Sequence, residues 1–183
     1  MPCKRAQKCL IQRKLQTKWV CLVMVFTVFI SHSKADIEIV KALYSTLKQS
    51  GINVYVAEFR LEPGVRLSQK ICRNIETSDC VLVLLTREGI SSAWVQQEVG
   101  IAQRANKLII PVVEKGVRAA GVLEGREYIE LDKENPWNTI AQINKYAEYL
   151  KAQKEQAERA RVGGLAILAI LAGLFFVAAL SGD

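Results

Sequence analysis

Four short apolar runs, spaced about one strand–helix unit apart, constrain the fold of this chain more than any other feature. They begin at Val25, Ile52, Cys80 and Leu108, and a shorter fifth run covers Tyr128 to Leu131. The runs are rich in β-branched residues and mostly do not alternate with polar residues, which is typical of strands buried on both faces. Their spacing of 27 or 28 residues leaves room for one helix between successive strands.

The segments between the runs have helical periodicity. Apolar residues recur at helical spacing in four groups: Val40–Leu43–Tyr44–Leu47, Leu67–Ile71–Ile75, Trp94–Val99–Ala102 and Ile140–Ile143–Ala147–Leu150. Asp36 near the start of the first group and Gly51 just past its end are typical helix boundary residues. Alternating strands and helices predict an α/β fold, with a five-stranded parallel sheet and helices on both faces.

A candidate site follows the third strand. Trp94 and Glu98 are four residues apart, so a helix would place them on one face, with Ser92 positioned to cap its start. In parallel α/β sheets, ligands bind just past the carboxyl ends of the strands. A tryptophan four residues before a glutamate is also common in helices without any catalytic role. We expect Glu98 to be partly exposed.

Several enzyme classes that share this type of fold lack their motifs here. The sequence contains no Walker loop, no G-x-G-x-x-G and no G-x-S-x-G. The third strand does not end in the aspartate of a phosphoacceptor domain, and the loop after the first strand has no glycine to hold a flavin phosphate. His32 is the only histidine, and no C-x-x-C occurs, so we predict no metal site.

Read together, five segments resemble a Toll/interleukin-receptor (TIR) domain of the prokaryotic kind. They are Phe29 to Ser33 with Asp36, Ala57-Glu58 with Glu62-Pro63-Gly64, Ile75 to Asp79, Ser92-Ala93-Trp94 with Glu98, and Ile109 to Val112. The resemblance covers roughly residues 24–150 and implies a flavodoxin-like sheet. Many microbial members of this family cleave NAD⁺ to nicotinamide and ADP-ribose or cyclised ADP-ribose, whereas others only assemble signalling complexes.

The resemblance also implies roles for individual residues. The catalytic glutamate of the family corresponds to Glu98, with Trp94 beside it. The residues at the end of the first strand, Phe29, Ile30, Ser31 and His32, would frame the pocket for NAD⁺, the substrate. Separately from the resemblance, the loop arginines Arg60 and Arg66 are candidates to meet its pyrophosphate, although loop arginines are usually solvated. The loop that contains Glu58, Pro63 and Gly64 corresponds to the family's mobile loop, which gates the pocket and makes TIR–TIR contacts. No cofactor is implied.

One carboxylate is compatible with this chemistry. Nicotinamide leaves NAD⁺ as a neutral molecule from a pyridinium, so no acid is required to protonate the leaving group, unlike in ordinary glycosidases. A carboxylate that holds the ribose can stabilise the oxocarbenium-like centre. The sequence leaves one further function open, a non-catalytic adaptor that acts through TIR–TIR assembly. Nucleoside deoxyribosyl transfer shares the fold type and a catalytic glutamate but lacks support elsewhere in the chain.

The positive charge of the chain is concentrated before residue 24. The net charge is +7, with 25 basic and 18 acidic residues, and six of the basic residues lie in the leader 1–23. The rest is nearly neutral, so we expect no nucleic-acid partner. Three readings of the leader remain: a start codon chosen upstream of Met24, a signal peptide, or a basic arm that binds anionic lipid.

Of the five cysteines, Cys72 and Cys80 follow the leader, and we expect both to be reduced.

The final predicted element is a transmembrane helix. Residues 162–180 contain no charge, and at about 1.5 Å per residue they nearly span a hydrocarbon core. Basic residues in the segment 151–161 precede this run and only Asp183 follows it, so the positive-inside rule places the TIR domain in the cytoplasm, tail-anchored to the cell membrane. We expect residues 151–161 to form a charged helical linker that continues the last domain helix.

Overall fold

The computed structural model of the chain describes residues 25–59, 64, 66–118, 123 and 125–180; beyond residue 161 and at Glu58 it describes the backbone only. The strands are β1 (Thr27–Ser31), β2 (Asn53–Tyr55), β3 (Cys80–Leu85), β4 (Leu108–Glu114) and β5 (Ile129–Leu131). The α-helices are α2 (Ile37–Gln49), α3 (Leu67–Thr77), α4 (Arg87–Ile90), α5 (Ala93–Arg104) and α6 (Pro136–Leu180). Two single-turn 3₁₀ helices are η1 (Lys34–Asp36) and η2 (Ala57–Phe59).

The five strands form one parallel sheet in the order β2-β1-β3-β4-β5. This order confirms the prediction of a five-stranded parallel sheet. The chain first adds β2 on one side of β1 and then returns to add β3 on the other. The strand order therefore reverses between β1 and β3, which is where sheets of this kind bind ligands.

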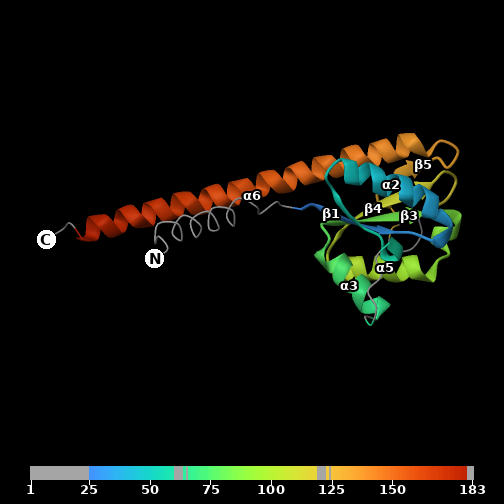
Figure 1. The fold of residues 1–183 in the computed structure, drawn as a ribbon, viewed down its shortest axis with the longest axis horizontal. Coiled ribbons are helices and arrows are strands. Elements are labelled where there is room, and N and C mark those ends of the chain that lie inside the picture. The colour runs from blue at the N-terminus through green and yellow to red at the C-terminus, as the bar shows by residue number, and fades with distance from the viewer. Residues whose placement is uncertain (1–24, 60–63, 65, 119–122, 124, 181–183) are drawn as a thin grey trace, which may run out of the picture.

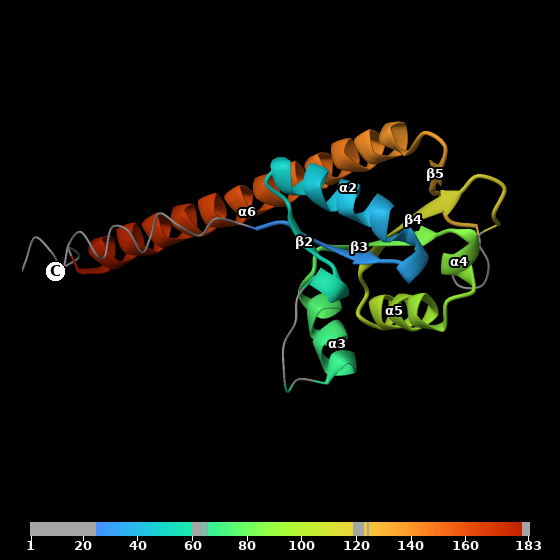
Figure 2. The ribbon, with the colours of Figure 1, turned by 45° about the vertical axis from the view of Figure 1, so that its right-hand side comes forward.

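Helices cover both faces of the sheet, as Figures 1 and 2 show. Helices α2 and α6 pack on one face over the core cluster that contains Ile30, whereas α3 and α5 pack on the other over the cluster that contains Phe29. Adjacent residues of β1 thus point to opposite faces, as the strand period of two requires. All six residues of β3 are buried, which explains why its sequence does not alternate.

Cys80 begins this buried strand, and its side chain is a packing group. Burial, together with the neighbouring Asp79 carboxylate, raises the pKa of the Cys80 thiol to about 12. The thiol is therefore protonated at neutral pH and is a poor nucleophile. Cys72 and Cys80 are both free cysteines.

The buried face of α5 differs from the predicted one. Val95, Glu98, Val99 and Ala102 are its buried residues, whereas Trp94 is 37% exposed. The predicted stripe of Trp94, Val99 and Ala102 was therefore wrong at its first position. Val95 and Val99 are four residues apart and make the regular helical stripe, which leaves Trp94 at the rim.

Helix α6 packs on the domain in its first half and continues away from it (Figure 1). Lys151 Nζ donates to the Ser50 carbonyl at 3.1 Å, and Lys154 Nζ lies 2.7 Å from Asp79. The predicted linker 151–161 is thus helical, and its first turn still contacts the domain. The leader 1–23 and the side chains of the predicted span 162–180 lie outside the described residues. Within the described part of the chain, no helix is long and apolar enough to cross a membrane.

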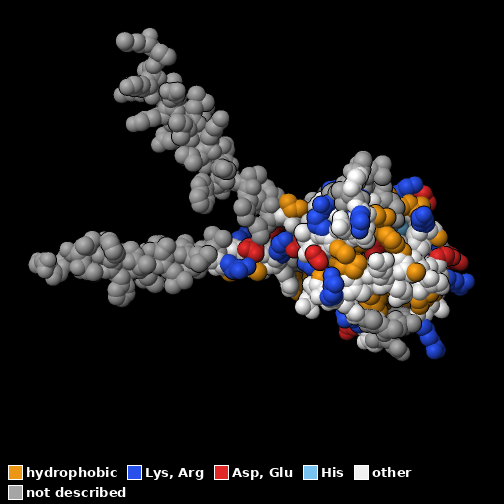
Figure 3. All heavy atoms as spheres, turned by 90° about the horizontal axis from the view of Figure 1, so that it is seen from below, with side chains coloured by type: hydrophobic (Ala, Val, Ile, Leu, Met, Phe, Trp, Pro, Cys, Tyr) orange, Lys and Arg blue, Asp and Glu red, His pale blue; other side chains and the backbone are white. Residues whose placement is uncertain are grey.

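The surface of the domain agrees with its nearly neutral charge. On the face in Figure 3, Lys and Arg side chains of the described residues are scattered among hydrophobic and uncharged ones. These side chains do not form a continuous basic patch on that face.

Candidate active site

Glu98 lies in the second turn of α5, and its position follows from the way this helix begins. Ser92 is the N-cap, and its hydroxyl accepts a hydrogen bond from Val95 N at 3.4 Å, which confirms the predicted cap. Glu98 and Trp94 line the same small cavity, together with Ser68 and Ile71 of α3. The predicted pairing of Trp94 and Glu98 on one helix face is therefore present.

The Glu98 side chain is buried rather than partly exposed. Only 3% of it is accessible, because α3 packs over this part of α5. The cavity that it shares with Trp94 has a volume of about 10 Å³. A single water molecule needs roughly this volume, so no nucleotide fits beside Glu98 in this conformation. The sequence did not reveal this burial, because a glutamate is seldom found inside a protein.

The end of β1 places two of the predicted substrate residues on the Glu98 side of the sheet. Phe29 is fully buried and stacks on Tyr55, with ring centroids 5.5 Å apart. Ser31, two residues further along the strand, shares this face, and its buried hydroxyl has no hydrogen-bond partner among the described residues. A buried hydroxyl of this kind is usually satisfied by a water molecule or a ligand.

The other predicted contact residues are distributed differently. Ile30 belongs to the core cluster under α2 and α6, on the face opposite Glu98, and His32 is buried just beyond β1. Arg60 and Pro63 lie outside the described residues. The backbone of Glu58 is in η2, and Gly64 is exposed with a φ of +85°. The structure thus brings Phe29, Ser31, Trp94 and Glu98 to one side of the sheet and does not place Ile30 with them.

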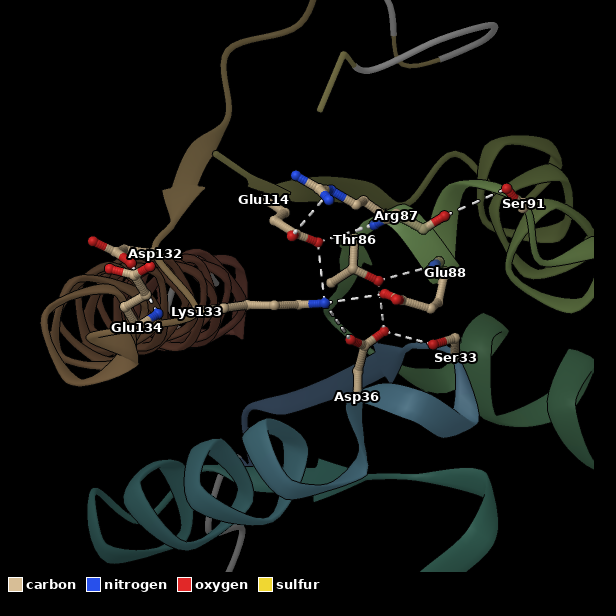
Figure 4. Close-up of polar contacts among 11 residues, drawn as sticks. Ser33, Asp36, Thr86, Arg87, Glu88, Ser91, Glu114, Asp132, Lys133 and Glu134 are labelled. Carbon is tan, nitrogen blue, oxygen red and sulfur yellow. Dashed lines mark hydrogen bonds and ion pairs between the residues drawn. The ribbon is translucent and has the colours of Figure 1, made fainter. Parts of the chain in front are cut away.

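Polar side chains fill the carboxyl edge of the sheet, where the strand order reverses (Figure 4). Asp36 Oδ2 accepts hydrogen bonds from Ser33 Oγ at 2.6 Å and from Thr86 Oγ1 at 2.8 Å. Thr86 also caps α4, because its hydroxyl oxygen accepts from Gly89 N at 2.9 Å. A side chain at position 89 would collide with the Leu84 carbonyl, so glycine allows α4 to pack against β3.

Lys133, from the loop after β5, joins the same group of residues. Its ammonium lies 3.0 Å from Glu88, 3.1 Å from Glu114 and 3.7 Å from Asp36. We call Asp36, Thr86, Glu88, Glu114 and Lys133 the carboxyl-edge cluster. The cluster ties the segments that follow β1, β3 and β5 to the last residue of β4.

The ionisation of the cluster reflects these contacts. Burial alone would lower the pKa of Lys133, but hydrogen bonds to Glu88 and Glu114 and the charges of Asp36 and Glu114 raise it above the usual value. Burial alone would raise the pKa of Glu114, but hydrogen bonds from Arg87 N and Lys133 and their positive charges lower it. The hydrogen bond from Lys133 is the main cause that lowers the pKa of Glu88.

Sequence reasoning missed Lys133 and Glu114. The signal that could have found them is the polar residue that follows each predicted strand, since parallel strands end at the same edge of the sheet. Within the described ranges, no three His, Cys, Asp or Glu side chains are arranged to hold a metal ion.

An α/β sheet of order β2-β1-β3-β4-β5 with a buried glutamate at the start of α5 defines a flavodoxin-like domain with one candidate catalytic carboxylate. Residues 28–145 match the family model described as TIR domain, and the chain belongs to this family.

Two curated relatives are similar in sequence. The 2′ cyclic ADP-D-ribose synthase AbTIR of Acinetobacter baumannii is 36% identical over 95 residues, which are 49% of this chain and 35% of that protein. The probable 2′ cyclic ADP-D-ribose synthase TcpO of Methanobrevibacter olleyae is 30% identical over 74 residues, which are 40% of this chain and 22% of that protein.

The chain therefore spans about a third or less of the length of these two relatives. Among solved structures, the TIR domain of the Toll-related receptor TRR-2 from Hydra magnipapillata is similar, with a TM-score of 0.54 and 20% identity, over 64% of this chain and 97% of that one. The metazoan TIR-STING receptor from C. gigas has a TM-score of 0.53 and 25% identity, over 64% of this chain and 39% of that one. The similarity to these two structures shows that the chain has the TIR fold.

Proposed function

We propose that this TIR domain cleaves the bond between nicotinamide and ribose in NAD⁺ and that Glu98 is the catalytic carboxylate. The observation that carries the proposal is the buried Glu98 carboxylate beside Trp94 near the start of α5. The same sheet face holds the Ser31 hydroxyl, which has no hydrogen-bond partner among the described residues. The names of the two curated relatives support NAD⁺ as the substrate, since cyclic ADP-ribose is a product of NAD⁺ cleavage.

In the proposed reaction the bond between C1′ and the pyridinium nitrogen breaks, and its electron pair leaves with neutral nicotinamide. The ribose becomes oxocarbenium-like, and the negative charge of Glu98 stabilises it in a site from which water is largely excluded. In cyclisation a hydroxyl of the same molecule attacks C1′ and releases its proton. In hydrolysis water attacks instead. The names of the relatives favour cyclisation.

The described conformation is closed, because the cavity beside Glu98 holds about 10 Å³. NAD⁺ would enter only if α3 moved away from α5. In this account Trp94, 37% exposed at the rim, would contact the nucleotide once the site opens. The energy of binding, or of contact with a second TIR domain, would drive this opening.

The alternative function is a non-catalytic adaptor that acts by TIR–TIR assembly. The small cavity beside Glu98 favours it, and so does the exposure of Gly64, which belongs to the predicted contact loop. The two functions differ in one measurement. An NAD⁺-cleaving enzyme releases nicotinamide when copies are clustered, whereas an adaptor binds other TIR domains without consuming NAD⁺.

We also propose that residues 162–180 anchor the chain in the membrane of the cell, with the TIR domain in the cytoplasm. The support is the uncharged run itself and the basic residues that precede it. Confinement in a membrane would raise the effective concentration of TIR domains and favour their contact. Such clustering suits a signalling or defence response.

The test is to incubate the full chain in liposomes with NAD⁺ and to measure nicotinamide by chromatography and the sugar product by mass, since cyclised and hydrolysed ADP-ribose differ by one water. We expect nicotinamide release, faster per molecule than from a soluble chain that ends at Arg161. No nicotinamide from clustered, folded protein would reject the enzyme in favour of the adaptor. Recovery of the full chain in the aqueous fraction after membrane flotation would reject the anchor.

A further inference from the structure

A second concave surface lies at the β5 edge of the sheet and shares no lining residue with the cavity beside Glu98. Strand β5 pairs only with Val112, Val113 and Glu114 of β4, so the first four residues of β4 extend beyond it. Helix α6 and the residues just before β5 border this part of β4 and leave a groove of about 830 Å³ between them. We call it the edge groove. Its volume is within the range of small-molecule sites.

Large apolar side chains are unusually exposed in the edge groove. Leu108, Tyr128, Tyr146 and Tyr149 line it and are 45%, 53%, 40% and 56% exposed. They make up four of the nine exposed large hydrophobic residues in the described part of the chain. Exposed apolar surface gathered in one concave place is typical of a binding site.

The tyrosines are arranged as an aromatic wall. Tyr146 and Tyr149 lie one turn apart on α6, with ring centroids 6.3 Å apart and planes inclined by 23°. Gln153 Nε2 donates to the Tyr149 hydroxyl, which holds the second ring in place. Tyr128 enters from the segment before β5. Rings of this kind stack on planar aromatic ligands at little cost in conformational entropy.

The charged groups of the groove are mainly positive. Arg126 and Lys145 line it, and Glu127 is its one acidic residue. The polar groups therefore consist largely of donors around an apolar floor. Arg126 and Lys145 are exposed to solvent, so a neutral apolar ligand would gain nothing from them, whereas an anionic group would pair with them. The complementary ligand has a flat aromatic body and a negative end.

We propose that the edge groove binds a planar aromatic anion of the nucleotide class, with the ring against the tyrosines and the anionic group at Arg126 and Lys145. This site is separate from the candidate active site. Helix α6 covers the face of the sheet that contains Ile30, and Glu98 lies on the opposite face. The proposal therefore does not depend on whether the protein cleaves NAD⁺.

The test uses AMP as the probe, with titration calorimetry on the full chain in detergent. We expect AMP to bind, and adenosine and inorganic phosphate to bind roughly tenfold more weakly, because each lacks either the charge or the ring. Tyr146→Ala and Lys145→Glu should each weaken AMP binding by about tenfold. Lys115→Glu makes the same charge change at an exposed lysine outside the groove and should leave the affinity unchanged.

Glu98→Gln separates this site from the active site, because AMP binding at the edge groove should persist in that variant. AMP binding that is unchanged in folded Tyr146→Ala and Lys145→Glu would overturn the proposal. So would the absence of AMP binding at millimolar concentration. If Tyr146→Ala instead alters the oligomeric state and AMP binding is unaffected, the groove is an interface between copies of the chain and the proposal is wrong.

Discussion

Thr86 Oγ1 donates a 2.8 Å hydrogen bond to Asp36 Oδ2 and thereby connects the segments that follow β3 and β1. These strands flank the point where the strand order reverses, which is the usual ligand site of such a sheet. In this protein, side chains of the carboxyl-edge cluster lie between the ends of β1 and β3. Glu98 lies elsewhere, between α5 and α3. We therefore expect the carboxyl-edge cluster to act in stability, and the proposed chemistry to take place between α3 and α5.

Replacement of Thr86 by valine should destabilise the domain. Valine keeps the shape of the side chain but removes the bond to Asp36 and the cap on Gly89 N. Because both partners are buried, we expect a loss of about 2–4 kcal/mol in the free energy of unfolding. Urea denaturation followed by circular dichroism measures it.

Thr77→Val is the matched control. Thr77 is exposed at the end of α3, and its hydroxyl bonds only to carbonyls of its own helix. The expected change is below about 0.5 kcal/mol. Equal effects of the two substitutions would show that the Asp36–Thr86 bond adds nothing to stability.

The pH dependence of stability should reveal the ion pairs of Lys133. The folded pKa values of Glu88 and Glu114 are lowered from 4.5, so their contribution is present above pH 4.5 and is lost as the pH falls through the lower folded values. The folded pKa of Lys133 is raised from 10.5, so its contribution is present below pH 10.5 and is lost as the pH rises through the higher folded value.

Lys133→Met removes these ion pairs at every pH, whereas in the wild type they are lost only at low and at high pH. The difference in unfolding free energy between wild type and variant should therefore be largest near neutral pH and should shrink toward both extremes. Lys115→Met, at an exposed lysine outside the cluster, should give no such profile. A difference for Lys133→Met that stays constant across the pH range would mean that the lysine acts by packing alone.

The sequence predicted the five strands and four long helices well, because apolar periodicity reports directly on buried faces. The prediction that Trp94 belongs to the buried face of α5 was wrong, and Val95 is buried instead. Both residues are apolar, and only the packing of α3 against α5 decides which one is buried. The burial of Glu98 was not predicted for the same reason, because it too depends on the packing of α3 against α5. Lys133 was missed because its partners Asp36, Glu88 and Glu114 are distant in sequence and meet only at the edge of the folded sheet.

Gly64 provides a test of the predicted contact loop. Its φ of +85° is one that side chains rarely adopt, although an added Cβ would meet no atom within 4 Å. Gly64→Val should therefore change the conformation of the loop without a clash in the core. We expect weaker self-association and lower nicotinamide release from liposomes, measured by light scattering and chromatography.

Gly116→Val is the matched substitution, because Gly116 has a φ of +83° and equally open surroundings in the turn after β4. It should cost similar stability and leave self-association unchanged. If the two variants associate alike, the loop at Gly64 only connects η2 to α3.

The central claim is that Glu98 performs the chemistry, and nicotinamide release by Glu98→Gln tests it most directly. Glutamine keeps the size of the side chain and removes its charge, so the protein should fold, with a stability loss of about 1–3 kcal/mol because the group is buried. Gln96→Ala, at an exposed position of α5 that does not line the cavity beside Glu98, is the control and should retain activity. We predict that Glu98→Gln in liposomes releases nicotinamide at least about 100-fold more slowly than wild type. A folded Glu98→Gln protein with wild-type activity would contradict the account.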